Sequence, residues 1–250
     1  MSRLGKLFKA MGMIMGRPWL LNKIVESDEE YLQQLKKKYR ISALPVVSHD
    51  QFIGNEFEVF PYSFLDGTSS LIDLALLRAL AEGIPDCRYL EIGTWRGESV
   101  ANVAAVAKEC VTINLSDAEM RAKGWDERYI GLHRTLSKTL PNVKHVDANS
   151  QTDDLSHLGK FDLIFIDGDH HYSSVVSDTK KCLPLLKNDQ SILVWHDYAF
   201  SPLNPRAEVL LAILDGMPPK DHQHLFQPSH SMCCIYTKKT MIAEPFNPFP

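Results

Sequence analysis

From residue 88 onward, apolar runs of strand length alternate with amphipathic segments of helix length. These periods predict a regular series of strands and helices. The strands are expected at 88–93, 111–115, 143–148, 161–167 and 191–196, and the helices at 97–109, about 126–139, 172–186 and 205–215. The runs at 161–167 and 191–196 are almost continuously apolar, which is typical of strands buried on both faces of a parallel sheet. The pattern therefore predicts an α/β protein with a mostly parallel sheet.

The pattern changes at the last of these helices and beyond it. Asn204 as N-cap, Pro205 in the first turn and Gly216 after the end frame that helix. Two further strands, 222–227 and 232–238, follow with no helix between them. Strands joined so closely pair antiparallel. We therefore expect a C-terminal antiparallel hairpin at one edge of a sheet of seven strands.

The first third of the chain is organised differently. A capping box at Ser27–Glu30 predicts a helix that runs to about Arg40. A loop-rich connection follows, with five aromatic side chains between residues 52 and 64, and a helix at 69–82 precedes the first strand. We therefore divide the chain into an N-terminal helical extension with an aromatic loop (1–67), one large α/β domain (68–242) and an extended tail (243–250).

Composition narrows the class of protein. A hydrophobic content of 44% and a charged content of 23% are those of a globular protein, and a net charge of −4 gives no support to nucleic-acid binding. The cysteines form no C-x-x-C pair and no disulfide framework, so reduced thiols and a cytoplasmic location are expected. They are Cys87, Cys110, Cys182, Cys233 and Cys234.

Charge is unevenly distributed along the chain. Residues 1–40 hold nine Lys or Arg and four Asp or Glu, a balance of +5, so the remainder carries −9. Residues 1–25 are basic and apolar, but their apolar stretch is too short for a transmembrane segment and no signal-peptide cleavage site follows it. Two interpretations stay open for residues 1–25. They form a peripheral anchor on a membrane surface, or a helix packed on the domain or on a second subunit of a homo-oligomer.

The segment 88–100 predicts a ligand site. A strand ends near Glu91, Gly93 allows a tight turn, and Gly97 lets the following helix pack close to the strand. The glycine spacing is G-x-x-x-G, with Trp95 between the glycines, instead of the G-x-G-x-x-G of dinucleotide sites. The bulky indole leaves little space for a diphosphate, whereas an acid before the turn suits an amino group.

This segment resembles the first motif of class I S-adenosylmethionine-dependent methyltransferases, E/D-x-G-x-G-x-G, with Trp95 replacing the central glycine. The strand order extends the resemblance over residues 88–239. It implies a Rossmann-like sheet of seven mostly parallel strands with a C-terminal antiparallel hairpin and an N-terminal helical extension. It also implies that S-adenosylmethionine is the cofactor, with Asn114 where the family has an acid for the ribose. The implied cofactor-binding residues are Glu91, Gly93, Thr94, Trp95, Gly97, Ser99, Asn114, Leu115, Asn149, Ser150 and Asp167.

Acids and histidines follow the fourth and fifth strands. Asp167-Gly168-Asp169-His170-His171 ends one strand and His196-Asp197 ends the next. Ligands bind beyond the carboxyl ends of such strands, and several ionisable groups there indicate a functional site. Asp167, His196 and Asp197 suit a divalent metal such as Mg²⁺. The same residues also suit general-base catalysis, with His170 or His196 as the base and Asp167 or Asp197 orienting it.

The pair of motifs D-G-D-H-x-Y and H-D-Y resembles the small-molecule O-methyltransferase branch of the family, of the catechol-like, macrolide-sugar-like and methyltransferase family 24 type. Some members place Mg²⁺ at these strand ends, although many have an acid where this chain has His196. The resemblance implies O-methylation of a small molecule or sugar hydroxyl. The aromatic loop, with Tyr62, and residues 198–204 are the expected acceptor pocket.

Two alternatives stay open, because a fold does not fix a chemistry. One is a metal-dependent, hydroxylase-like enzyme on the same fold. The other is a non-catalytic module that binds S-adenosylmethionine.

Overall fold

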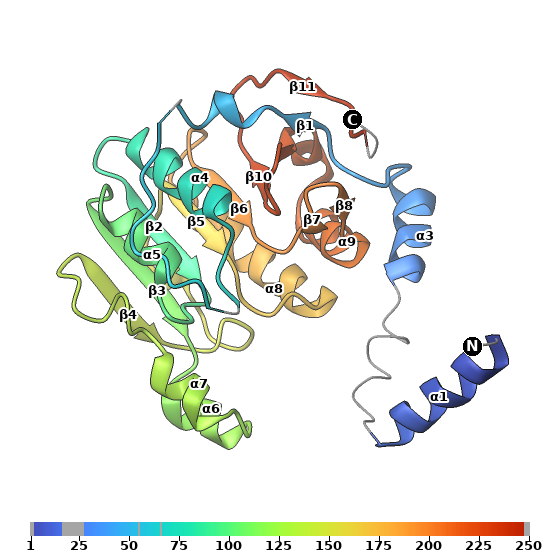
Figure 1. Cartoon of the computed structure of the whole chain (residues 1–250). Coiled ribbons are helices and arrows are strands. Elements are labelled where there is room, and N and C mark those ends of the chain that lie inside the picture. Colours follow the sequence, from blue (N-terminus) through green and yellow to red (C-terminus); the bar gives the residue numbers. More distant parts are fainter. Residues whose placement is uncertain (1–2, 17–27, 55, 66, 248–250) are drawn as a thin grey trace.

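The computed structural model describes residues 3–16, 28–54, 56–65 and 67–247. A twisted sheet forms its centre, with helices on both faces (Figure 1). The sheet order is β11-β1-β9-β10-β6-β5-β2-β3-β4. The parallel strands are β2 (Arg88–Ile92), β3 (Glu109–Asn114), β4 (Val143–Asp147), β5 (Leu163–Ile166) and β6 (Ile192–Trp195). The Rossmann-like architecture predicted from the sequence is therefore confirmed.

The predicted C-terminal hairpin is also present. Its strands are β9 (Leu225–Pro228) and β10 (Cys234–Tyr236), and β10 pairs antiparallel with β6. The first hairpin strand is shorter than predicted, because Pro219–His224 is a 3-10 helix.

Within the described residues, the sheet has nine strands, where seven were predicted. Two short strands extend the β9 edge: β1 (Val46–Val47) lies parallel to β9, and β11 (Ala243–Glu244) pairs antiparallel with β1. The connection after the first helices and the C-terminal tail thus pair with backbone groups that the edge would otherwise leave open. A separate two-stranded ribbon consists of β7 (Ala199–Ser201) and β8 (Asn204–Pro205).

The helices cover both faces of the sheet. They are α4 (Leu71–Glu82), α5 (Glu98–Ala104), α6 (Asp117–Ala122), α7 (Glu127–Leu132), α8 (Tyr172–Cys182) and α9 (Ala207–Gly216), preceded by α1 (Arg3–Gly16) and α3 (Asp28–Lys38). Successive residues of β5 and β6 enter two different cores. Leu193 and Trp195 join the core under α8 and α9, while Ile192 and Val194 join the core under α4 and α5. This alternation explains the continuous apolar runs in the sequence.

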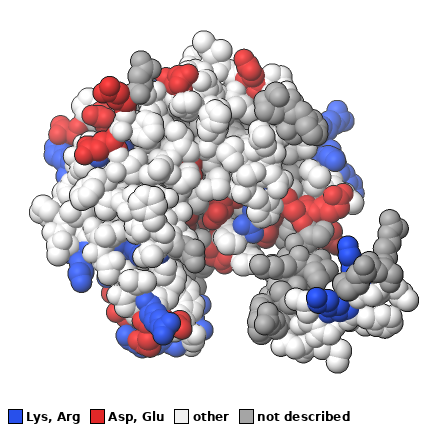
Figure 2. All heavy atoms as spheres, viewed as in Figure 1, with Lys and Arg blue, Asp and Glu red and all other residues white. Residues whose placement is uncertain are grey.

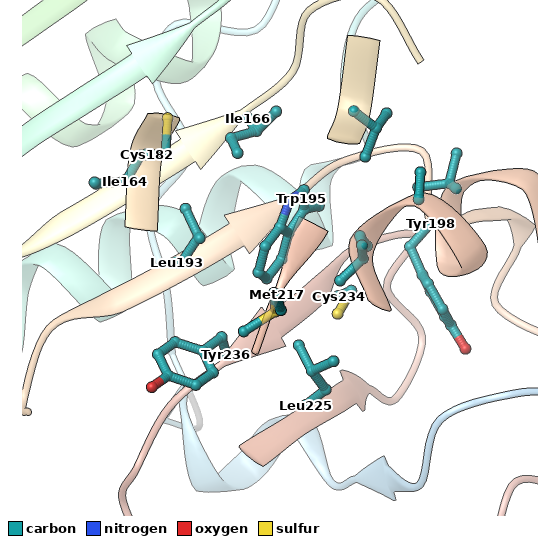
Figure 3. Packing of buried hydrophobic residues seen from close by; sticks show 14 of the residues in the cluster. Ile164, Ile166, Cys182, Leu193, Trp195, Tyr198, Met217, Leu225, Cys234 and Tyr236 are labelled. Atoms are coloured by element: carbon teal, nitrogen blue, oxygen red, sulfur yellow. The ribbon is translucent and has the colours of Figure 1, made fainter. Parts of the chain in front are cut away.

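Trp195 is the largest side chain of the core under α8 and α9, and Figure 3 shows it among Ile166, Leu193 and Met217. Its indole N–H donates to Thr179 Oγ1 at 2.9 Å, so its one polar atom is satisfied inside the core. All five cysteines are free and buried, as expected.

Three helix predictions need correction. The helix expected at 97–109 ends at Ala104, as α5, and β3 already begins at Glu109. The helix expected at 126–139 ends already at Leu132, as α7, and a helix that was not predicted, α6, precedes it and starts with a capping box between Ser116 and Glu119. The last helix starts at Ala207 instead of Pro205. Asn204 does not cap it, because Asn204 lies in β8; instead, the Asp28 carboxylate accepts hydrogen bonds from the backbone N–H groups of Ala207 (2.7 Å) and Glu208 (2.8 Å).

The N-terminal extension divides into two parts. α3 packs on α9, and its Leu35 is fully buried in the core. The N-cap expected at Ser27 lies outside the described residues. α1 stands apart from the sheet in Figure 1. Within the described part of the chain, none of the helices combines the length and apolar character that a membrane crossing needs.

Candidate active site

The glycine turn after β2 lies where the strand order of the sheet reverses, with β3 on one side of β2 and β5 on the other. Gly93 has a φ of +97°, and a Cβ atom there would lie 2.0 Å from the backbone oxygen of Asp167. The close approach of the Asp167 backbone, at the end of β5, therefore requires glycine at position 93. Gly97 has a φ of +84° and closely approaches Ser137, so this glycine accommodates the chain after α7 in addition to starting α5.

Two cavities open at this edge of the sheet, of about 570 Å³ and 470 Å³. They share Gly93, Trp95, Tyr129, Asp167 and His170 as lining residues. Of the other expected cofactor-binding residues, Asn114, Leu115, Asn149 and Ser150 line the larger cavity, and Thr94, Gly97 and Ser99 line the smaller one. The structure therefore gathers these residues around one continuous region.

Glu91 is the exception among the expected cofactor residues. It is fully buried, and its carboxyl group accepts hydrogen bonds from the Tyr89 hydroxyl (2.7 Å) and the Thr112 hydroxyl (3.3 Å). Burial raises the pKa of Glu91 to about 8, so the folded chain favours its neutral form at pH 7. Contact between Glu91 and a cofactor amino group stays a prediction.

Asn114 has a structural reason for being neutral. Its Oδ1 accepts from the Thr94 backbone N–H at 3.4 Å, and its Nδ2 donates to the Leu115 carbonyl at 3.1 Å. A carboxylate could make the first contact but would face the Leu115 carbonyl without a proton to donate. The amide thus ties the glycine turn to the end of β3.

An aromatic wall, formed by Trp95, Tyr129 and Trp125, lines the larger cavity. The rings of Trp95 and Tyr129 stack at 3.5 Å between centroids, and Trp125 meets Tyr129 edge-on at 5.1 Å. Tyr129 and Trp125 are not among the predicted site residues, because the pattern around them indicates only a helix. Their signal in the sequence was two large aromatic residues within a mostly polar stretch. Such faces suit a planar, nitrogen-containing ring.

The acid–imidazole cluster consists of Asp167, His196 and Asp197 at the ends of β5 and β6. His196 Nδ1 lies 3.2 Å from Asp167 Oδ1 and 3.5 Å from Asp197 Oδ1. His170 Nδ1 lies 3.6 Å from the other oxygen of Asp197. The structure thus brings together the four residues for which a catalytic role is predicted.

A fourth acid, Asp73 of α4, lies behind the cluster and was missed in the sequence. Asp73 Oδ2 is 3.6 Å from His196 Nε2, and its carboxylate accepts from the hydroxyls of Ser70 and Ser231, both at 2.5 Å. Asp73 is fully buried. The signal that could have revealed it is a single acid within the apolar run Leu71–Leu80.

The surroundings of His196 favour its charged form. Burial alone would lower the pKa of His196, but Asp167, Asp197 and Asp73 together raise that pKa well above 6.5. Burial raises the pKa of Asp167, while contact with His196 holds the pKa of Asp73 below its usual value against the effect of burial. These shifts together favour an imidazolium next to the carboxylates of the cluster.

The same atoms could hold a metal ion. One ligand atom each from Asp167, His196 and Asp197 lie within 4.8 Å of one another. Two carboxylates and an imidazole are a suitable donor set for a divalent ion of intermediate hardness. A second group, Asp73, His196 and Cys233, is as close, but burial raises the pKa of the Cys233 thiol well above its usual value, which disfavours a thiolate ligand.

Tyr62 and residues 198–204, the expected acceptor pocket, are not among the residues that line these two cavities, and their role stays a prediction. Phe60 and Phe64 of the aromatic loop are 72% and 83% exposed. Tyr198 is buried, and its hydroxyl accepts from the Leu44 N–H at 3.0 Å. Gly67 and Ser69, which lie between the aromatic loop and α4, line the smaller cavity.

Comparison with known proteins identifies the class. Residues 90–198 match a family model (type 24) described as "Methyltransferase domain". This segment runs from β2 past the end of β6 and includes both the glycine turn and the acid–imidazole cluster. Residues 90–198 therefore form a methyltransferase domain, in agreement with the motif resemblance.

Solved structures with detectable similarity include an S-adenosylhomocysteine complex of an O-methyltransferase from Bacillus cereus (15% identity, 70% of this chain and 84% of that chain, TM-score 0.47). A methyltransferase from Podospora anserina, also bound to S-adenosylhomocysteine, has 18% identity over 70% of this chain and 81% of that chain, with a TM-score of 0.45. The TDP-rhamnose 3'-O-methyltransferase of calicheamicin biosynthesis has 14% identity over 68% and 79%, with a TM-score of 0.45. A search of curated proteins found no match.

Proposed function

We propose that this methyltransferase transfers a methyl group to a hydroxyl oxygen of a small molecule or sugar in the cytoplasm. The observation that carries the proposal is the position of His170 and Asp167, which line both the larger and the smaller cavity, with Asp197 next to His170. Oxygen acceptors need a group that takes up the hydroxyl proton, and this edge of the sheet provides one.

We assign the larger cavity to the cofactor. Its aromatic wall suits the adenine ring, and Asn114 and Asn149 offer amides for polar groups of an adenosyl ligand. S-adenosylmethionine, when bound, supplies an electrophilic methyl group. The acceptor is then expected beside His170, where the smaller cavity continues past Gly93.

His170 is the better candidate for the general base. It lines both cavities, and Asp197 is close enough to orient its ring. The side chain of His196 is 10% exposed, and its raised pKa favours the protonated form near neutral pH, so it is poorly suited to accept a proton. Its positive charge instead stabilises the neighbouring carboxylates of Asp167 and Asp197. A positioned base contributes on the order of 10²–10⁴-fold to the rate.

A divalent ion such as Mg²⁺ is compatible with this arrangement. Asp167, His196 and Asp197 would hold it, and a bound ion would lower the pKa of an acceptor hydroxyl. His196 must lose its proton before it can ligate a metal. Metal affinity is therefore expected to increase with pH above neutrality.

The proposal is tested by His170→Ala with His171→Ala as the matched control. Turnover on a panel of catechols and sugar hydroxyls is measured with S-adenosylmethionine as donor, together with calorimetric binding of S-adenosylhomocysteine. We expect His170→Ala to lose 10²–10⁴-fold in turnover with near-normal binding, and His171→Ala to lose little. Equal turnover in both variants would refute the role of His170, and methylation of amines or nucleic acid alone would refute the O-methyl assignment.

A further inference from the structure

Helix α1 presents an apolar stripe that the rest of the described chain does not cover. Its large apolar residues recur at i, i+3, i+4, i+7 and i+11, the spacing that places them on one helix face. They are Leu4, Leu7, Phe8, Met11 and Met15, and each is between 52% and 83% exposed. A stripe of this size on a 14-residue helix is far more than scattered surface hydrophobicity.

The charge of this region is of one sign. Lys6 and Lys9 are exposed and project from the opposite side of the helix to the stripe, and residues 1–25 contain no Asp or Glu. In Figure 2, α1 shows blue side chains and no red ones on the face in view. Because residues after 40 carry a net charge of −9, the positive charge is concentrated at one end of an otherwise acidic chain.

We infer that α1 lies in the surface of an anionic phospholipid membrane and anchors the methyltransferase there. The apolar stripe would enter the boundary between headgroups and acyl chains, while the lysines remain at the level of the anionic headgroups. A negatively charged membrane attracts residues 1–25 and repels the rest of the chain, which favours contact through this helix.

The helix provides its own matched control. Two residues along an α-helix rotate by about 200°, so Met13 lies opposite Met11. Met11 and Met13 are similarly exposed, at 52% and 47%. Met11→Glu and Met13→Glu therefore make the same chemical change on the same helix, once on the apolar stripe and once on the polar side.

The experiment is flotation of the full chain with vesicles of phosphatidylcholine alone and of phosphatidylcholine with phosphatidylglycerol. We expect binding to the anionic vesicles, weakened by salt. Met11→Glu should lower it by more than about tenfold, and Met13→Glu by only about fivefold, the effect of one charge near the surface. Lys9→Gln should also cost about fivefold. Circular dichroism and S-adenosylhomocysteine binding should be the same in all variants.

Three results would overturn the inference. One is absence of binding to anionic vesicles by the intact chain. Another is equal loss in Met11→Glu and Met13→Glu, because the apolar stripe would then have no special role. The third is a dimer, measured by sedimentation without lipid, that Met11→Glu dissociates while vesicle binding stays the same, which would assign the stripe to a second copy.

Discussion

The two halves of the carboxyl edge of the sheet differ in chemistry. The half formed by β2, β3 and β4 offers amides, backbone groups and the aromatic wall, as Asn114 and Tyr129 illustrate. The half formed by β5 and β6 offers the acid–imidazole cluster, with Asp73 behind it. The halves meet where Gly93 touches Asp167. We therefore propose that the neutral half binds the cofactor and that the charged half accepts the proton of the acceptor.

We expect the largest loss of stability from a substitution at the junction between the two halves. Gly93→Ala places a methyl group against the Asp167 backbone at a positive φ, and we expect a loss of about 2–4 kcal/mol in the free energy of unfolding. Urea unfolding measures it. The control is Gly131→Ala in α7, where a Cβ meets nothing within 4 Å and a slight gain is expected. Equal stability of the two variants would show that the close approach is unimportant.

The charged half should depend on Asp73. Asp73→Asn removes one counter-charge of His196, and we expect a loss of about 2–3 kcal/mol, somewhat below that for a closer buried pair. Because the fold raises the pKa of His196, its stabilising contribution is complete below pH 6.5 and is lost as pH rises through the higher folded value.

Urea midpoints between pH 6 and 9 test this dependence, which should be weaker in Asp73→Asn than in the original chain. Asp50→Asn is the control, since Asp50 pairs with His49 at 3.2 Å at the surface and its removal should change stability by less than about 1 kcal/mol. An unaltered pH dependence in Asp73→Asn would contradict the proposed coupling.

The neutral half should determine affinity for the cofactor. Asn114→Ala removes the amide that faces the larger cavity and holds the glycine turn, and we expect S-adenosylhomocysteine to bind about tenfold more weakly. Asn142→Ala is the control, because Asn142 donates to the Ala104 and Ala107 carbonyls away from the cavities. Calorimetry should find the original affinity in the control, and an equal loss in both variants would argue against a direct role for Asn114.

The smallest effect is expected at Glu91. The raised pKa means that the folded chain keeps the proton up to about pH 8 whereas the unfolded chain releases it near 4.5. Stability should therefore fall as pH rises between these values, by about 1 kcal/mol from pH 6 to pH 7. Glu91→Gln should lack this part of the pH dependence in urea unfolding. A parallel pH profile in both proteins would show that Glu91 is already ionised.

Local patterns predicted what depends on neighbours in the sequence. The apolar runs located β5 and β6, and the carboxyl ends of adjacent parallel strands necessarily share one edge, which is why the meeting of Asp167, His196 and Asp197 could be predicted. The resemblance of the glycine turn added the class of cofactor, since the G-x-x-x-G spacing alone fits an ordinary turn.

Contacts between distant segments could not be predicted in this way. Asp28 caps α9 from 180 residues away along the chain, and nothing near Ala207 indicates it. β1 and β11 each have two residues and exist because the edge of β9 offers partners. Asp73 of α4 pairs with His196 at the end of β6. The apolar pattern of α4 indicates only that this acid is buried, and it does not indicate the partner.

Calorimetric titration with S-adenosylhomocysteine tests the central claim most directly, first in EDTA and then with Mg²⁺. If the neutral half binds the cofactor by itself, micromolar binding should appear in EDTA and change little when Mg²⁺ is added. Binding only with Mg²⁺ would contradict the division between the two halves. Absence of binding under both conditions would contradict the assignment of the larger cavity to the cofactor.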